Sequence, residues 1–155
     1  MRKLSDAFEE ARATTVEWNG SSVHSMFRIE GVAPGSRVRV RFERSNGARP
    51  QGLRIRVVGG TVEAAGQSAD NVVLWVDSAP PEVTATVAAT GDPVELRLWN
   101  AWRDPRGTMH AWIGNAGMLV EDSGDGSFFF RCSDGSGDVA FDDLVVSVAI
   151  DRPSS

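Results

Sequence analysis

Residues 35–45, GSRVRVRFERS, alternate between apolar residues and arginines. The apolar residues share one face of an extended chain and the arginines share the other, which is typical of a β-strand with one buried and one hydrated side. Residues 53–58, LRIRVV, repeat this pattern. The segment between them contains Asn-Gly, Pro and Gly, so the two runs are predicted to pair as a hairpin whose arginines form one ladder on the outer face.

Short runs of the same kind recur along the chain. Turn sequences such as APGS, SAPPE, TGDP and SGDG separate them, each combining Gly or Pro with a small polar residue. The predicted strands cover residues 23–30, 36–44, 53–58, 71–77, 82–90, 94–102, 108–113, 117–121, 127–132 and 143–150. About ten short strands at this spacing predict an all-β fold, an antiparallel β-sandwich of jelly-roll type.

The N-terminal segment is the one part of the chain with a helical pattern. In residues 4–13, LSDAFEEARA, apolar residues recur at helical spacing and Asp6 is available as a cap, which predicts a short amphipathic helix with a first strand as the alternative. A chain of 155 residues can bury a self-sufficient core. We therefore expect residues 1–155 to form a single β-sandwich domain, with residues 151–155 as a disordered tail.

Two segments resemble a known family of sandwiches. Residues 27–43, FRIEGVAPGSRVRVRFE, are similar to the opening of galactose-binding-like jelly-roll modules, in which a strand leads through a Pro-Gly-Ser turn into a core strand. Residues 128–150, FFFRCSDGSGDVAFDDLVVSVAI, resemble their close, where an aromatic strand, a Gly-rich loop and an Asp-Asp-Leu step precede the last strand. The resemblance implies a jelly-roll sandwich of the kind that often serves as a carbohydrate-binding accessory module.

The charge and the apolar content of the chain limit the classes of partner that we expect. The chain has a net charge of −5, although residues 28–56 carry eight arginines against two glutamates. Proteins that bind nucleic acid through phosphate contacts are usually basic, so nucleic acid is not an expected partner. No apolar run approaches the ~20 residues that span a bilayer, so no membrane partner is expected either. The N-terminus lacks the apolar stretch of a secretory signal, which predicts a cytoplasmic protein.

Residues 96–118, LRLWNAWRDPRGTMHAWIGNAGM, hold three of the five tryptophans and one of the two histidines. On strand parity Trp99 points outward, and if RDPRG is a hairpin loop, His110 and Trp112 share its face. Indole rings stack on sugars and other ring systems, while neighbouring polar groups can fix hydroxyl or carboxylate groups. The predicted ligand-binding residues are Arg97, Trp99, Arg103, Asp104, His110, Trp112 and Asn115.

Three interpretations of this tryptophan cluster remain open. The rings can be packing residues, a subunit contact in a homo-oligomer, or a site for a glycan or similar small molecule. The favoured function is a non-catalytic ligand-binding or interaction domain with a glycan-type ligand. The alternatives are a self-associating structural or protein-interaction domain and a small β-barrel enzyme acting on an apolar or cyclic substrate.

Catalytic and metal signatures are weak. Cys132 is the sole cysteine and shares strand parity with Phe128 and Phe130, which predicts a buried, inert thiol. No nucleophile-elbow sequence accompanies either histidine. Four aspartates lie in two glycine-rich loops, where turn formation is favoured over calcium binding: Asp122, Asp125, Asp134 and Asp138. We therefore predict no catalytic residue, metal or cofactor.

Overall fold

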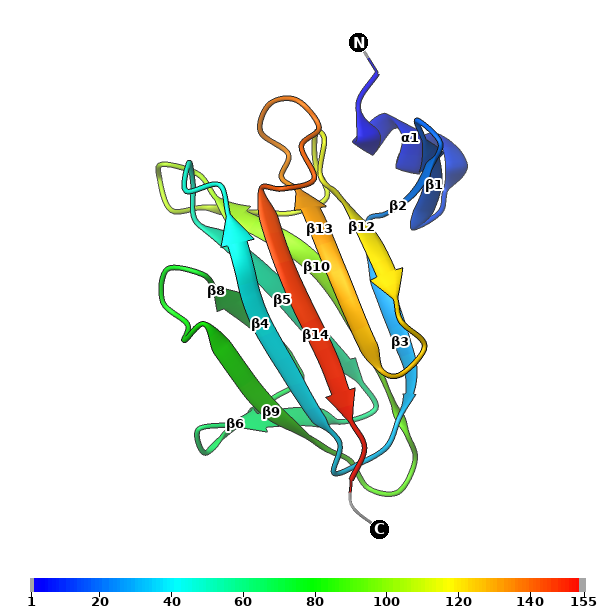
Figure 1. The fold of residues 1–155 in the computed structure, drawn as a ribbon, viewed down its shortest axis with the longest axis vertical. Coiled ribbons are helices and arrows are strands. Elements are labelled where there is room, and N and C mark those ends of the chain that lie inside the picture. Colours follow the sequence, from blue (N-terminus) through cyan, green and yellow to red (C-terminus); the bar gives the residue numbers. More distant parts are fainter. Residues whose placement is uncertain (1, 154–155) are drawn as a thin grey trace.

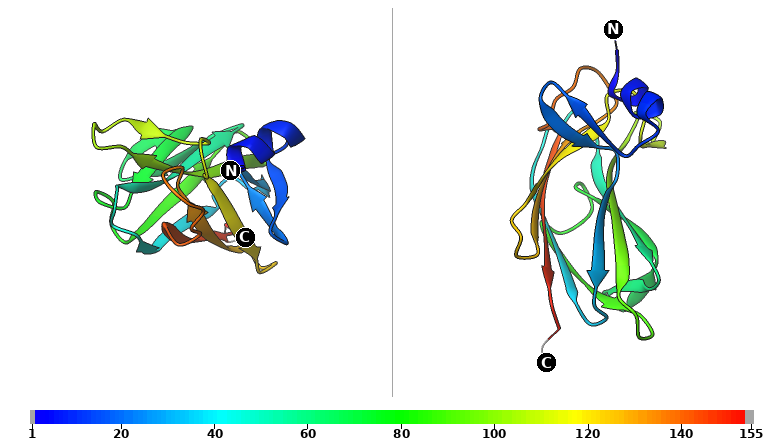
Figure 2. Two further views of the ribbon diagram at one scale, coloured as in Figure 1. Left: turned by 90° about the horizontal axis from the view of Figure 1, so that it is seen from above. Right: turned by 90° about the vertical axis from the view of Figure 1, so that its right-hand side faces the viewer.

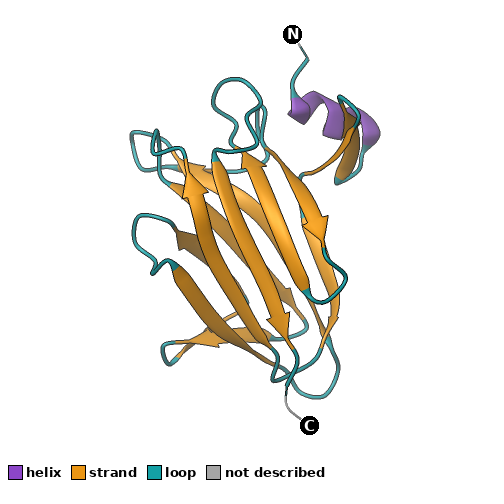
Figure 3. Cartoon of the chain, in the orientation of Figure 1, coloured by secondary structure: helices purple, strands orange, loops and turns teal. Residues whose placement is uncertain are grey.

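The computed structural model describes residues 2–153, which form two antiparallel β-sheets and one short helix (Figures 1 and 3). The sheets pack face to face, and Figure 2 shows the two layers edge-on with the helix at one end. The larger sheet contains, in spatial order, β1 (Thr15–Trp18), β2 (Ser21–His24), β12 (Gly117–Asp122), β13 (Ser127–Ser133), β14 (Leu144–Asp151), β4 (Arg37–Ser45), β9 (Glu82–Ala88), β6 (Thr61–Ala64) and β7 (Gln67–Ala69).

The smaller sheet is built around one long strand. Its path runs through β11 (Met109–His110), β10 (Val94–Arg103), β5 (Gln51–Val58) and β8 (Asn71–Trp75), and β3 (Phe27–Val32) also pairs with β10. Successive strands β3, β4 and β5 alternate between the two sheets, as do β9, β10 and β12. This winding confirms the predicted antiparallel β-sandwich.

Every predicted strand has a counterpart in the structure whose ends differ by at most two residues, except at three places. The range 23–30 is split between β2 and β3 at Ser25 and Met26. The range 108–113 is a strand only over Met109–His110, because the chain then leaves the edge of β10 and forms a loop. Strands β1, β6 and β7 are missing from the prediction because each has at most four residues, too few for alternation to stand out.

The predicted hairpin between β4 and β5 is wrong. The two strands lie in different sheets, so residues 46–50 connect one layer to the other at the end of the sandwich. Side chains hold this crossing: Asn46 donates to Asp143 at 2.8 Å, and Arg49 forms an ion pair with Asp134 at 2.8 Å. The arginines therefore form two separate sets on opposite outer faces rather than one ladder.

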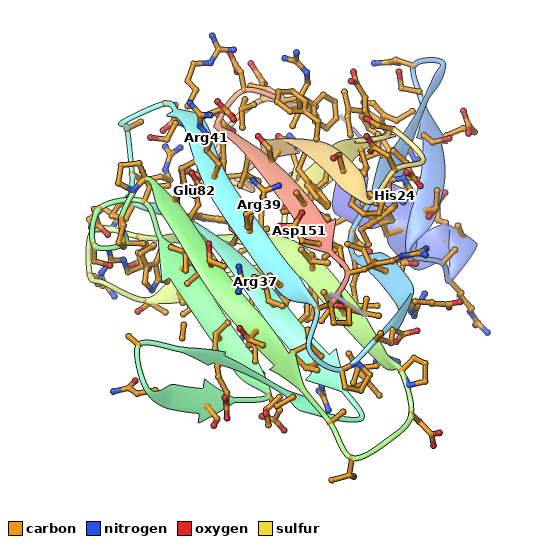
Figure 4. The ribbon with its side chains drawn as sticks, turned by 60° about the horizontal axis from the view of Figure 1, so that its bottom comes forward. His24, Arg37, Arg39, Arg41, Glu82 and Asp151 are labelled. Carbon is orange, nitrogen blue, oxygen red and sulfur yellow. The ribbon has the colours of Figure 1, made fainter. Side chains whose placement is uncertain are left out.

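The outer face of the larger sheet carries the first set, shown in Figure 4 as Arg37, Arg39 and Arg41 of β4. Arg39 pairs with Asp151 and lies 3.9 Å from a carboxylate oxygen of Glu82. Arg41 lies 3.6 Å from a carboxylate oxygen of Glu43. Neighbouring carboxylates therefore compensate much of the charge of this arginine set.

The core lies between the sheets and matches the inward positions of the sequence pattern. Val38 and Val40 of the larger sheet and Leu53 and Ile55 of the smaller belong to one buried cluster. Cys132 is fully buried in the same cluster, as predicted, and burial raises the pKa of its thiol far above the ordinary value.

Helix α1 (Leu4–Ala11) confirms the predicted helix. Asp6 accepts a hydrogen bond from the backbone N–H of Lys3 at 3.0 Å, the contact expected of an acidic residue in the first turn. Leu4 and Ala7 pack with Val16 and Val23 of the β1–β2 hairpin in a second, smaller apolar cluster. The helix thus covers one end of the sandwich.

The C-terminal strand extends further than predicted. Asp151, expected in a disordered tail, is the last residue of β14 and is held by Arg39. Of that tail, residues 154–155 lie outside the described residues. Within residues 2–153, no helix has the length and apolar character that crossing a membrane requires.

Candidate functional site

Trp99 and Trp112 form a ring stack on the outer face of the smaller sheet. Their ring centroids are 4.7 Å apart with 33° between the planes. Both β3 and β11 pair with the same edge of β10, β3 up to Leu98 and β11 from Trp102 onward. Trp99 lies in the gap between these partners, where the loop that carries Trp112 folds over the strand.

The prediction that Trp99 is exposed is wrong, although its outward parity is right. Trp99 is opposite Arg54 on β5, and the Arg54 guanidinium carbon lies 5.7 Å from the centre of its ring. Covered by Arg54 and Trp112, the Trp99 side chain is only 6% exposed. Trp99 therefore lies beneath the surface and supports Trp112, because the loop that follows β11 covers it.

Trp112 is the exposed member of the stack, with half of its surface accessible. Its indole N–H donates to the carbonyl oxygen of Ser25 at 2.9 Å. Its backbone adopts φ of +62°, a left-handed conformation that costs a non-glycine residue about 1–2 kcal/mol. The ring is thus fixed by stacking and by a hydrogen bond while one side faces solvent.

The loop around Trp112 is tied to its neighbours by backbone and amide contacts. Asn115 accepts from the backbone N–H of Leu4 at 3.1 Å and donates to the carbonyl of Gly137 at 2.8 Å. The carbonyl of Gly114 accepts from the N–H of Ser5 at 2.9 Å. Both ends of the Asn115 amide are therefore occupied by structural bonds, which does not favour its predicted role in ligand binding.

An open groove of about 600 Å³ adjoins the exposed ring. Trp112 and Ile113 line one side, and Phe8, Glu9 and Arg12 of the helix and its C-terminal end line the other. Glu9 and Arg12 are solvent-exposed and offer hydrogen-bonding groups beside the apolar rings. We call this feature the Trp112 groove.

Two more of the predicted ligand residues stabilise the hairpin loop instead. Asp104 accepts hydrogen bonds from the backbone N–H groups of Arg106 and Thr108 and contacts the Nε2 of His110 at 2.9 Å. The hydrogen bond with His110 and those from Thr108 and Arg106 lower the pKa of the Asp104 carboxyl. His110 is opposite Trp102 in the strand register, so it lies on the other face from Trp99 and the prediction that they share a face is wrong.

Arg97 and Arg103 share the outward face of β10 with Trp99 but differ in surroundings. Arg103 lies over the ring of Trp75 at 4.5 Å and pairs with Asp77. Arg97 pairs with Glu95 at 2.6 Å, on the side of Trp99 away from the hairpin loop. The structure thus brings together Arg97, Trp99 and Trp112 on one face, uses Asn115 to hold the Trp112 loop, and places Arg103, Asp104 and His110 toward the hairpin loop.

The remaining polar clusters are structural. Asp134 is fully buried and accepts from Arg49 and Gln51, each at 2.8 Å. Burial raises the pKa of Asp143, which accepts from the backbone N–H of Asp134. Aspartates 122, 125 and 134 each accept a hydrogen bond from an N–H two residues later, which is the turn role predicted for them. Among residues 2–153, no group of three metal-ligating side chains is close enough to hold an ion.

An apolar pocket of about 260 Å³ lies between the sheets at the opposite edge from the helix. Val40, Ile55, Val62 and Leu74 are among its lining residues, and Gln67 and Ser68 provide polar groups. None of the residues that line it has a titratable side chain.

Sequence reasoning missed several groups at the site. The Trp112 groove depends on the N-terminal helix, and the carbonyl that accepts the hydrogen bond of the Trp112 indole belongs to Ser25, 87 residues away in sequence. The alternation in residues 53–58 predicted an outward Arg54, but the predicted hairpin paired its strand with β4, whereas β5 pairs with β10. Comparisons with family models, curated protein sequences and solved structures found no match to this chain.

Proposed function

We propose that this chain is a non-catalytic ligand-binding module that stacks a sugar ring on the exposed side of Trp112. The observation that carries the proposal is that Trp112 is both exposed and held in place. Trp112 is half exposed, yet its ring stacks on Trp99 and its indole N–H donates to the carbonyl oxygen of Ser25. A rigid, exposed indole loses little conformational freedom when a ligand ring binds to it.

The surroundings of Trp112 support a ligand with both apolar and polar faces. A sugar presents C–H groups on the face of its ring and hydroxyl groups at its rim. The Trp112 groove offers an indole to the former and the exposed Glu9 and Arg12 side chains to the latter. The left-handed backbone of Trp112 adds a local strain of the kind that clusters at functional sites.

Affinity gel electrophoresis with polysaccharides embedded in the gel tests this proposal. We expect wild-type protein to be retarded by at least one gel of a set containing dextran, xylan, polygalacturonate and dextran sulfate. Trp112→Ala should migrate as it does in a gel without polysaccharide, whereas Trp112→Phe should keep part of the retardation. Val58→Ala is the control, because it removes an exposed apolar side chain that does not line the Trp112 groove. Equal retardation of Trp112→Ala and wild type would refute the proposal.

Self-association is the second candidate, and exposed apolar side chains favour it. Met109, Trp112 and Ile113 are 39%, 50% and 51% exposed and lie on one short segment. Tryptophan and methionine are enriched at the centres of protein interfaces. If the segment is a subunit contact, wild type should elute as a dimer in size-exclusion chromatography with light scattering. Both Ile113→Asp and Trp112→Ala should then elute as monomers.

A further inference from the structure

Three arginines stand in a row on the outer face of the smaller sheet. Arg97 of β10 is directly opposite Arg28 on β3 and Arg56 on β5. Directly opposed residues of an antiparallel pair project to the same face with their Cβ atoms about 5 Å apart. We call Arg28, Arg97 and Arg56 the arginine row.

The positive charge of the row is only partly compensated by the protein. Arg97 pairs with Glu95 at 2.6 Å, but neither Arg28 nor Arg56 forms an ion pair within residues 2–153. Both of these side chains are exposed. On the larger sheet, by contrast, Arg39 has the carboxylates of Asp151 and Glu82 beside it (Figure 4), and Arg41 lies beside that of Glu43. Like charges that are directly opposed destabilise a sheet, so a bound anion would relieve repulsion within the row.

The row adjoins the ring stack. Arg97 and Trp99 are two residues apart on the same face of β10, which places their Cα atoms about 7 Å apart. Ser25, whose carbonyl fixes the Trp112 ring, is three residues before Arg28 in the chain. Acidic groups on a sugar stacked at Trp112, or on the next sugar of a chain, can therefore reach the row.

We propose that the ligand of this face is an anionic saccharide, which stacks a ring on Trp112 and places a carboxylate or sulfate group on the arginine row. This inference rests on the proposed function and specifies its ligand class. The planar guanidinium group matches the paired oxygens of carboxylates and sulfates and binds them through two hydrogen bonds. The net charge of −5 disfavours a general attraction to polyanions, so recognition depends on this local row.

Affinity electrophoresis in gels that differ in polymer charge tests the inference. Polygalacturonate supplies carboxylates, dextran sulfate supplies sulfates, and dextran is the neutral control. We expect wild-type protein to be retarded by an acidic polymer and not by dextran, and the two acidic gels tell which anion binds. The double variant Arg28→Gln/Arg56→Gln should weaken binding about 100-fold, since a charge-assisted contact contributes about tenfold for each arginine.

A charge-matched variant on the other sheet separates specific from general attraction. Arg37→Gln/Arg41→Gln removes the same charge from exposed positions of β4 and should bind like wild type. An equal loss in both double variants would overturn the inference. So would the absence of binding to both acidic polymers, or tighter retention by a single-stranded oligonucleotide through the same arginines.

The failure of this inference and that of the proposed function give different results. Binding to neutral dextran that needs Trp112 but not Arg28 or Arg56 would refute the anionic ligand and leave the stacking function standing. Binding to an acidic polymer that needs the arginines but is unchanged in Trp112→Ala would refute the stacking function, and with it the arrangement inferred here. The inference is supported only if Trp112→Ala and Arg28→Gln/Arg56→Gln both lose binding to the acidic polymer.

Discussion

The Trp99–Trp112 stack makes a quantitative prediction about stability. Trp99 is 6% exposed, so Trp99→Ala removes a buried ring and should destabilise the fold by about 3–5 kcal/mol. Trp112 is half exposed and contributes mainly its stacking on Trp99, so Trp112→Ala should cost only about 0.5–1.5 kcal/mol. The two substitutions should therefore differ severalfold although they remove the same side chain.

A double-mutant cycle measured by urea denaturation isolates the stack. The coupling energy between the two substitutions should be about 0.5–1.5 kcal/mol, because Trp112 has no ring to stack on once Trp99 is removed. In thermal unfolding, each kcal/mol should shift the Tm by about 2–4 °C for a chain of this size. If Trp99→Ala cost less than about 1 kcal/mol, Trp99 would be a surface residue and the assignment of support to Trp99 and contact to Trp112 would be refuted.

Three further predictions concern other parts of the molecule. Cys132 should resist thiol reagents in the native protein and react after denaturation, because burial raises the pKa of its thiol and blocks access; fast native labelling would show that it is exposed. The pKa of the Asp104 carboxyl is lowered on folding, so Asp104 stabilises the fold above its unfolded pKa near 4, and this stabilisation is lost as pH falls through the lower folded pKa. Asp104→Asn should flatten this part of the curve of stability against pH. An unchanged curve would contradict the contact with His110. Gly114→Ala should destabilise by more than about 1 kcal/mol, since the residue has φ of +58° and a Cβ would lie 2.3 Å from the carbonyl oxygen of Gly135; a Tm equal to wild type would show that the loop is placed differently.

Local patterns were sufficient to predict the elements but not the partners of each strand. Alternation identifies a strand because inward side chains must be apolar, as at Val38 and Val40. It does not specify which strand lies alongside. β4 and β5 look like a hairpin, yet the crossing at residues 46–50 depends on Asp134 and Asp143, about 90 residues later in the chain. Those long-range contacts leave no signal in the local pattern.

The candidate site shows the same limit. Parity along β10 correctly placed Arg97 and Trp99 on the outer face, because the strand is regular there. Parity failed for His110, which is opposite Trp102 on the inward side, and Trp112 shares the face of Trp99 only because the loop after β11 turns its ring back onto Trp99. The exposure of Trp99 also depends on this loop. Trp99, which was expected to contact the ligand, is covered by the loop and supports Trp112 instead.

The most direct test of the central claim is to record which indole N–H resonances respond to ligand. The chain has five tryptophans, at positions 18, 75, 99, 102 and 112, each with one side-chain signal in a ¹H–¹⁵N spectrum. On titration with oligosaccharides of the acidic polymer that retards the protein, we predict the largest shift for Trp112, a smaller one for Trp99, and little change for Trp18, Trp75 and Trp102. Shifts confined to tryptophans other than Trp112 and Trp99, or no shift at all, would contradict the account.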